Sequence, residues 1–149
     1  MQELKDRIVK EGKVLPGNII KVDGFLNHRI DTELMEHIAE EFGRHFNMDE
    51  VTMILTAEAS GIALSAVVAR HFNKPMIFAK KAKSDNIEGG LYQSDIFSYT
   101  YKKKVTLLVS KEWFSSEDRV LIIDDFMANG EAMRGLCDIV EKAGALSLI

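Results

Sequence analysis

The sequence has a single cysteine, no net positive charge and no long apolar run. One cysteine excludes an internal disulfide and fits a reducing cytoplasm. The formal net charge of −4 argues against a nucleic-acid-binding protein, because contacts to phosphates need a basic face. No apolar stretch approaches the roughly 20 residues that span a bilayer, and the charged start MQELKDRIVKEGK does not resemble a signal peptide. We therefore expect a cytoplasmic protein with no membrane or nucleic-acid partner.

Two familiar phosphate-binding signatures are also missing. No Gly-Lys-Ser/Thr completes a Walker loop, and the G-x-G-x-x-G fingerprint of dinucleotide-binding folds does not occur. The four histidines lack metal-ligand spacing, so ordinary surface or core positions are expected for them. The 149 residues are enough for one domain, and 46% of them are hydrophobic, as in an ordinary globular protein.

Strands and helices alternate from residue 51 onward. Buried strands are expected for VTMILT (51–56), PMIFA (75–79) and VLIID (120–124), with helices over 62–72 and 131–143. This alternation predicts an α/β fold with a mainly parallel sheet flanked by helices. Ligands in such sheets bind outside the carboxyl ends of the strands, which makes the loops at 57–61, 80–95 and 125–130 the candidates.

The N-terminal part and the middle of the chain are less regular. Helices are expected over 2–11 and from Asp31 or Thr32 onward, separated by an irregular stretch with a short apolar run at Ile19–Ile20. Residues 80–104 carry six lysines. We expect a mobile loop from Ala82 to Leu91 and an antiparallel hairpin turning at Lys102–Lys104. The alternative for the lysines is a solvated face.

Asp124 and Asp125 end the strand VLIID, and a loop of small residues leads from them to a helix. The free N–H groups and dipole at a helix N-terminus bind anions, so a phosphate fits there. The two carboxylates can accept hydrogen bonds from sugar hydroxyls or help to hold a hydrated Mg²⁺ ion. The alternative is a polar turn with an N-cap, and from spacing alone the two interpretations are evenly matched.

A second strand-helix loop, Thr56-Ala57-Glu58-Ala59-Ser60-Gly61, has small residues that allow close backbone approach. A second phosphate or a pyrophosphate could bind there. Taken alone, a plain turn capped by Ser60 would be the better interpretation. The two loops together with the lysine-rich segment instead indicate a ligand with anionic groups at both ends.

The segment VLIIDDFMANGEA resembles the phosphoribosyl pyrophosphate motif of type I phosphoribosyltransferases, and its spacing from TAEASGI is similar too. The N-terminal KVDGFLNHRID, taken with both loops, resembles the bacterial xanthine branch of that family. The resemblance covers the whole chain. It implies a single domain over 1–149 with the type I phosphoribosyltransferase fold, a base-binding hood within 1–31 and a lid loop with hairpin over 80–104.

The implied reaction is purine salvage, in which 5-phospho-α-D-ribose 1-diphosphate (PRPP) gives its phosphoribosyl group to xanthine. Asp124, Asp125 and Lys81 are implied as catalytic residues, with Lys81 supplied by the neighbouring subunit of a homodimer. Mg²⁺ would be held mainly by PRPP, with no protein side chain expected as its direct ligand. The residues implied to bind PRPP are Glu58, Ala59, Ser60, Gly61, Ala128, Asn129, Gly130, Glu131 and Ala132, and those implied to bind the purine are Ile20, Asn27 and Phe126.

The sequence departs from the family pattern in places. Asn129 and Ala132 stand where threonines are commoner, and Glu131 puts a carboxylate beside a phosphate site unless its side chain turns to solvent. Relatives continue past Ile149 to a lysine that completes the base pocket, so the chain is expected to lack a C-terminal part. The alternatives are another purine base (guanine, hypoxanthine or adenine), a PRPP-sensing regulator, or an inactive fragment.

Overall fold

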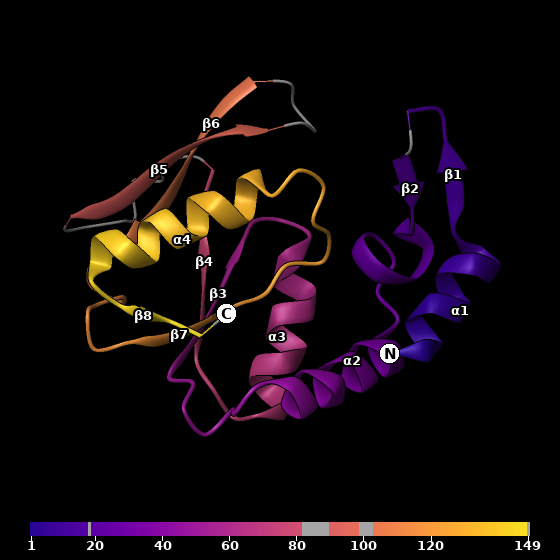
Figure 1. Ribbon diagram of the computed structural model, residues 1–149, viewed down its shortest axis with the longest axis horizontal. Coiled ribbons are helices and arrows are strands. Elements are labelled where there is room, and N and C mark those ends of the chain that lie inside the picture. Colours follow the sequence, from indigo (N-terminus) through magenta and orange to yellow (C-terminus); the bar gives the residue numbers. More distant parts are fainter. Residues whose placement is uncertain (18, 82–89, 99–102, 149) are drawn as a thin grey trace.

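A computed structural model describes residues 1–17, 19–81, 90–98 and 103–148 (Figure 1). Its central sheet has four parallel strands in the order β4-β3-β7-β8. These strands are β3 (Met53–Ala57), β4 (Met76–Ala79), β7 (Arg119–Ile122) and β8 (Leu146–Ser147). The expected parallel α/β sheet is therefore confirmed, with the two expected loop sites at the ends of its adjacent central strands β3 and β7.

The central strands consist of unbroken runs of apolar residues because both of their faces are buried. Successive side chains of a strand point to opposite faces. Accordingly Ile54 and Leu121 belong to one hydrophobic cluster, whereas Leu55 and Ile122 belong to the other. All four side chains are at most 7% exposed. The sheet thus forms the middle layer between two apolar cores.

Helices cover both faces of the sheet. The helices are α1 (Gln2–Glu11), α2 (Thr32–His45), α3 (Gly61–His71) and α4 (Glu131–Ala143). One core packs α2 and α3 against the sheet, and the other packs α4 on the opposite side. Gly144 has φ +70° and ends α4 in the left-handed conformation that favours glycine.

Strands β5 (Leu91–Ser98) and β6 (Lys103–Ser110) form the expected antiparallel hairpin, which lies over α4 (Figure 1). The pairing of Ser98 with Lys103 places Lys103 and Lys104 inside β6, so the expected turn at Lys102–Lys104 is wrong for these two residues. Lys142 ties α4 to β5 by donating to the backbone oxygen of Gln93 at 2.7 Å. The lid loop expected between Ala82 and Leu91 lies largely outside the described residues, as does Lys102.

The stretch between α1 and α2, expected to be irregular, contains regular structure. Strands β1 (Lys13–Leu15) and β2 (Ile19–Lys21) pair in an antiparallel hairpin, followed by the short π-helix η1 (Asp23–Asn27). We call residues 1–31 the hood, because they stand beside the sheet next to the loop that follows β7 (Figure 1). Phe25 and Leu26 anchor η1 in the core.

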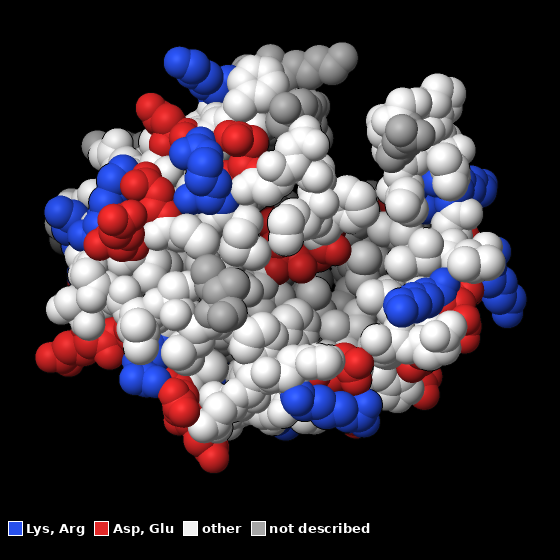
Figure 2. Space-filling model, viewed as in Figure 1, with Lys and Arg blue, Asp and Glu red and all other residues white. Residues whose placement is uncertain are grey.

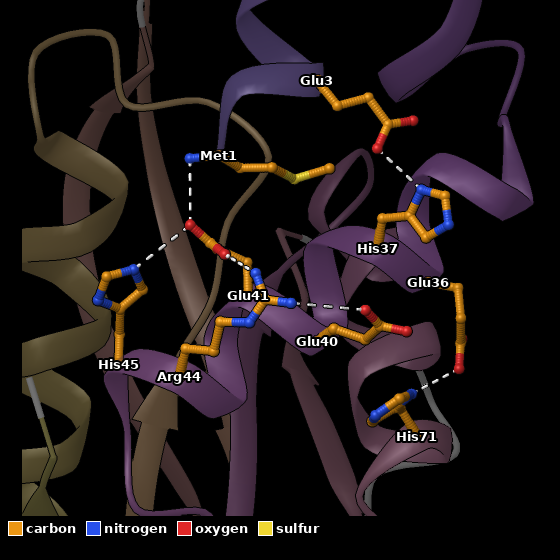
Figure 3. A network of polar contacts seen from close by, with 9 residues as sticks. All are labelled: Met1, Glu3, Glu36, His37, Glu40, Glu41, Arg44, His45 and His71. Carbon is orange, nitrogen blue, oxygen red and sulfur yellow. Dashed lines mark hydrogen bonds and ion pairs between the residues drawn. The ribbon is translucent and has the colours of Figure 1, made fainter.

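Polar contacts fasten the hood to the body of the protein (Figure 3). Glu3 of α1 binds the ring of His37 on α2 at 2.8 Å, and the N-terminal ammonium of Met1 pairs with Glu41 of α2 at 3.2 Å. Within the body, His71 of α3 binds Glu36 of α2 at 2.5 Å. These contacts give the histidines ordinary structural roles, as the sequence predicted. Within the described ranges, every helix is too short or too polar to cross a membrane.

Candidate active site

Three distant segments meet at the carboxylate of Asp125. Ser60, just before α3, donates its hydroxyl to Oδ1 at 2.7 Å. Asn27, at the end of η1, donates its amide Nδ2 to Oδ2 at 2.9 Å across 98 positions of sequence. The loop after β7, the loop after β3 and the hood therefore share one junction. Sequence reasoning placed all three residues in the site but did not anticipate that they bind one another.

Asp124 is a partly buried carboxylate directly beside Asp125. Burial raises the pKa of Asp124 from its ordinary 3.8 to about 7; Asp125 raises it further, whereas a backbone hydrogen bond from Asp125 and the charge of Lys81 oppose the shift. The backbone N–H of Asp125 donates to Asp124 Oδ1 at 2.9 Å. Near neutral pH the carboxyl can therefore gain or lose a proton readily when a ligand changes its surroundings.

Gly61 creates the space that Asp124 occupies. A Cβ atom at this position would overlap Thr56 Oγ1 and lie 2.6 Å from Asp124 Oδ1. Thr56 is fully buried, and its hydroxyl has no hydrogen-bond partner among the described residues. Sequence reasoning assigned Gly61 to a ligand loop and missed this second reason for a glycine. The close approach of Gly61 to Asp124 joins segments more than 60 residues apart, so it could be found only from the fold.

The loop before α3 leaves the N-terminus of that helix without a side-chain cap among the described residues. The alternative interpretation of this loop, a plain turn capped by Ser60, is wrong. No side-chain cap is found here in the described structure, and the Ser60 hydroxyl binds Asp125 instead. Glu58, whose peptide bond to Ala59 is cis, accepts the backbone N–H of Lys81 at 2.5 Å through Oε1. This loop, Glu58–Gly61, is open to an anion at the N-terminus of α3.

The loop before α4 likewise leaves the N-terminus of its helix without a side-chain cap among the described residues. Ala128 and Asn129 are exposed, and Gly130 enters the helix with φ +75°, a conformation suited to glycine. No side chain of the described residues caps α4, whereas Asp31 caps α2 by accepting the N–H of Leu34 at 3.2 Å. An uncapped N-terminus keeps its N–H groups available to a bound phosphate.

Glu131 does not point into this cradle. Its Oε2 accepts the backbone N–H of Phe97 at 3.3 Å and pairs with Arg134 at 3.1 Å. Arg134 and the Phe97 N–H hold the pKa of Glu131 below its usual range. The carboxylate is thus neutralised by an ion pair and faces β5. The sequence had suggested instead that this side chain turns to solvent.

A hollow lies between the hood and the rest of the molecule. Figure 2 shows this hollow, with acidic side chains at its base over the loop that follows β7 in Figure 1. Exposed apolar side chains are available in the adjoining segments, with Ile20 of β2 41% exposed and Phe126 48% exposed. A planar apolar ring and a polar, anionic group are the ligand features that such surroundings favour.

The described residues do not form a complete metal cage. Nowhere in residues 1–17, 19–81, 90–98 and 103–148 do three His, Cys, Asp or Glu side chains converge to hold an ion. Mg²⁺ commonly binds through one or two carboxylates together with substrate phosphates and water. Asp124 and Asp125 fit that mode, so an ion carried by a phosphorylated ligand is compatible with this donor set.

Residues 22–149 match the family model described as the phosphoribosyl transferase domain. The chain is 54% identical over 145 residues to the xanthine phosphoribosyltransferase of Lachnoclostridium phytofermentans, covering 97% of this chain and 75% of that protein. It is 49% identical over 146 residues to the enzyme of the same name from Bifidobacterium adolescentis, covering 97% of this chain and 76% of that protein. These matches extend over nearly all of the hood as well as the sheet.

Solved structures of low sequence similarity share the fold. The adenine phosphoribosyltransferase of Giardia lamblia superposes with a TM-score of 0.78 at 22% identity, over 95% of this chain and 78% of its own. The enzyme of that name from Saccharomyces cerevisiae gives 0.78 at 16% identity, over 99% and 86%. At such identities the likeness concerns the chain path alone.

Proposed function

The chain belongs to the phosphoribosyl transferase domain family, and from this premise we propose that it transfers the phosphoribosyl group of PRPP to xanthine, giving xanthosine 5′-phosphate and pyrophosphate. The observation that carries the choice of base is the identity of about half over 97% of the chain to relatives named xanthine phosphoribosyltransferase. Those matches include the hood, which the family model, beginning at residue 22, mostly leaves out.

The geometry supports separate binding sites for the three parts of PRPP: its 5′-phosphate, its ribose and its pyrophosphate. The 5′-phosphate would bind the backbone N–H groups at the start of α4, over residues 128–132. The pyrophosphate would bind at the loop 58–61 through the N–H groups of residues 59–61, because the N–H of Glu58 already donates to the backbone oxygen of Ala79. Asp124 and Asp125 lie between the two helix N-termini and would accept hydrogen bonds from the ribose hydroxyls. Each assignment follows from a donor or acceptor that the fold leaves accessible there.

In the proposed reaction a purine nitrogen forms a bond to the anomeric carbon as the bond from that carbon to pyrophosphate breaks. Charge develops on the ribose ring and on the leaving pyrophosphate. The protein acts by positioning the reactants and stabilising this charge, without a covalent intermediate. Lys81, whose backbone is tied to Glu58 of its own chain, would stabilise the pyrophosphate in the neighbouring subunit's site.

Mg²⁺ is the proposed cofactor, carried mainly by PRPP and approached by Asp124 and Asp125, where it would neutralise charge on the pyrophosphate. Asp124 is suited to respond, because a nearby cation favours its ionised form and its pKa is already about 7. Ionised Asp124 accepts hydrogen bonds from hydroxyls at both oxygens. Protonated Asp124 would have fewer acceptor sites for the ribose.

The purine would lie in the hollow between hood and sheet. Ile20 would supply an apolar wall, Phe126 an aromatic face, and Asn27 polar groups that read the edge of the base. Asn27 is already fixed to Asp125, so the groups that read the base and hold the ribose adjoin one another.

The test is release of pyrophosphate from PRPP and Mg²⁺ by the purified chain with xanthine, guanine, hypoxanthine or adenine. We expect xanthine to have the highest kcat/KM. A matched control is the Asp124→Asn, Asp125→Asn double variant, which should lose donor binding by calorimetry and keep its fold by circular dichroism. Equal kcat/KM for all bases would remove the xanthine assignment, and absence of release with any base would contradict the transferase activity.

We also propose a cytoplasmic homodimer in which Lys81 reaches the neighbouring site, as the family resemblance implies. Mixing chains that carry Lys81→Ala with chains that carry Asp124→Asn tests this, because a mixed dimer would contain one intact site. Recovery of activity on mixing supports a shared site, and its absence in verified heterodimers contradicts it.

A further inference from the structure

The hydrogen bond between Asn27 and Asp125 fixes the orientation of the Asn27 amide. A carboxylate only accepts hydrogen bonds, so the amide must turn its nitrogen toward Asp125. One N–H of Asn27 is used in this contact. The second N–H and the carbonyl oxygen Oδ1 are left for a ligand, which therefore meets one donor and one acceptor.

Asp125 is itself held in place. Its other carboxylate oxygen accepts the Ser60 hydroxyl at 2.7 Å, and its backbone N–H donates to Asp124. On the hood side, the buried side chains of Phe25 and Leu26 fix the helix that carries Asn27. Ser60, Asp125 and Asn27 thus form a chain of hydrogen bonds with anchored ends, and such networks make polar groups rigid.

We propose that Asp125 is a positioning residue for base selection, because it holds the Asn27 amide in the one orientation that matches xanthine. This inference rests on the proposed transfer to a purine. It assigns Asp125 a second role, distinct from contact with the ribose. The residue that holds the sugar would also determine which base the hood accepts.

Xanthine and guanine differ in the group at carbon 2, and this difference decides which base pairs with Asn27. Xanthine has a carbonyl at carbon 2 beside a ring N–H, and this edge pairs with one donor and one acceptor. Guanine has an amino group at carbon 2, which pairs poorly with the N–H of Asn27. If residue 125 were an amide, Asn27 could flip and exchange the positions of its donor and its acceptor. Its Oδ1 could then accept the guanine amino group, so the fixed selection against guanine would be lost. Sites built to pair a polar group discriminate strongly because a mismatched ligand leaves groups unpaired.

The experiment measures kcat/KM for xanthine and for guanine at saturating PRPP and Mg²⁺, in the wild type and in Asp125→Asn. We expect the xanthine-to-guanine ratio to fall about tenfold or more, the size typical of losing one well-placed polar interaction. The matched control is Asp124→Asn, which also replaces one carboxylate by its amide but lacks the contact to Asn27. It should slow both bases alike and keep the ratio.

A ribose contact alone would change the two rates equally, so an unchanged ratio in Asp125→Asn overturns the inference. If that variant is too slow to assay, calorimetric affinities for xanthosine and guanosine 5′-phosphates give the same ratio without turnover. Asn27→Ala should also lower the ratio, and adding Asp125→Asn to it should lower it no further, because the two act as one unit. A further fall of the xanthine-to-guanine ratio in the double variant would show that Asp125 does not act through Asn27. A wild type that uses no purine would contradict the proposed function instead.

Discussion

The backbone N–H of Lys81 donates to Oε1 of Glu58 at 2.5 Å and so ties the segment after β4 to the loop before α3. The contact joins the ends of two adjacent parallel strands, which pair from Ile54 with Met76 to Ala57 with Ala79. The bond uses the backbone N–H of Lys81, so replacing the Lys81 side chain leaves this donor in place. The charge of Lys81 already reaches Asp124 and partly offsets the rise of its pKa caused mainly by burial.

We expect Asp124→Asn to stabilise the protein at alkaline pH. The carboxyl has a pKa of about 7 when folded against 3.8 ordinarily, so it binds its proton more tightly in the folded state. The resulting stabilisation is complete below about pH 4 and is lost as the pH rises through about 7. An uncharged Asn avoids that loss, which amounts to about a few kcal/mol.

Thermal melts from pH 4 to pH 8 measure this effect. The melting temperature of Asp124→Asn should exceed that of the wild type by several degrees at pH 8, since each ~1 kcal/mol is about 2–4 °C in a chain of this size. The difference should narrow toward pH 4. Asp138→Asn is an opposite control, because Lys142 lowers the pKa of Asp138 and that stabilisation is lost as the pH falls. A pH-independent difference for Asp124→Asn would contradict the burial of its charge.

Gly61→Ala should damage both stability and donor binding. The added Cβ would overlap Thr56 Oγ1 and crowd Asp124, and overpacking of this kind costs about 1–3 kcal/mol. Urea unfolding and PRPP calorimetry report the two effects. Gly24→Ala is the matched control, since a Cβ there would have no other part of the described structure within 4 Å, its chain neighbours and own helix backbone aside. Equal, small effects for both variants would show that Gly61 is not required for close packing.

The glycine also illustrates what the sequence could and could not predict. The apolar runs around Leu55 and Leu121 predicted buried parallel strands because their period and length are local properties of the chain. The two loops proposed to bind phosphate were located from the sequence by their places after those strands. The pairing of Asn27 with Asp125 could not be predicted from the residues, because it depends on how the hood lies against the sheet. The role of Glu131 likewise depends on Phe97 and Arg134, whose proximity is a property of the fold.

Glu131→Gln should bind PRPP as tightly as the wild type or a few-fold more tightly. The substitution removes a negative charge near the proposed phosphate site, while an amide oxygen can still accept the Phe97 N–H. Calorimetry at low and high salt should show the gain shrinking with salt, as expected for exposed charges. Arg134→Gln should act in the opposite direction, because it leaves the Glu131 carboxylate without its ion pair. Weaker binding by Glu131→Gln would instead indicate a direct role of the carboxylate in holding the donor.

Lys81→Ala should lower kcat far more than it weakens binding of the base. The lysine is proposed to stabilise charge that develops on the departing pyrophosphate, and an interaction made mainly in the transition state affects turnover rather than ground-state affinity. Loss of one such charge-stabilising group typically costs roughly 10²–10³ in kcat. Lys80→Ala removes the same charge one residue earlier, where the backbone pairs with Leu108 of β6, and should have a much smaller effect. Steady-state kinetics with varied xanthine at saturating PRPP separate kcat from KM. If Lys80→Ala and Lys81→Ala slowed turnover equally, the effect would come from net charge, and Lys81 would have no specific place beside the pyrophosphate.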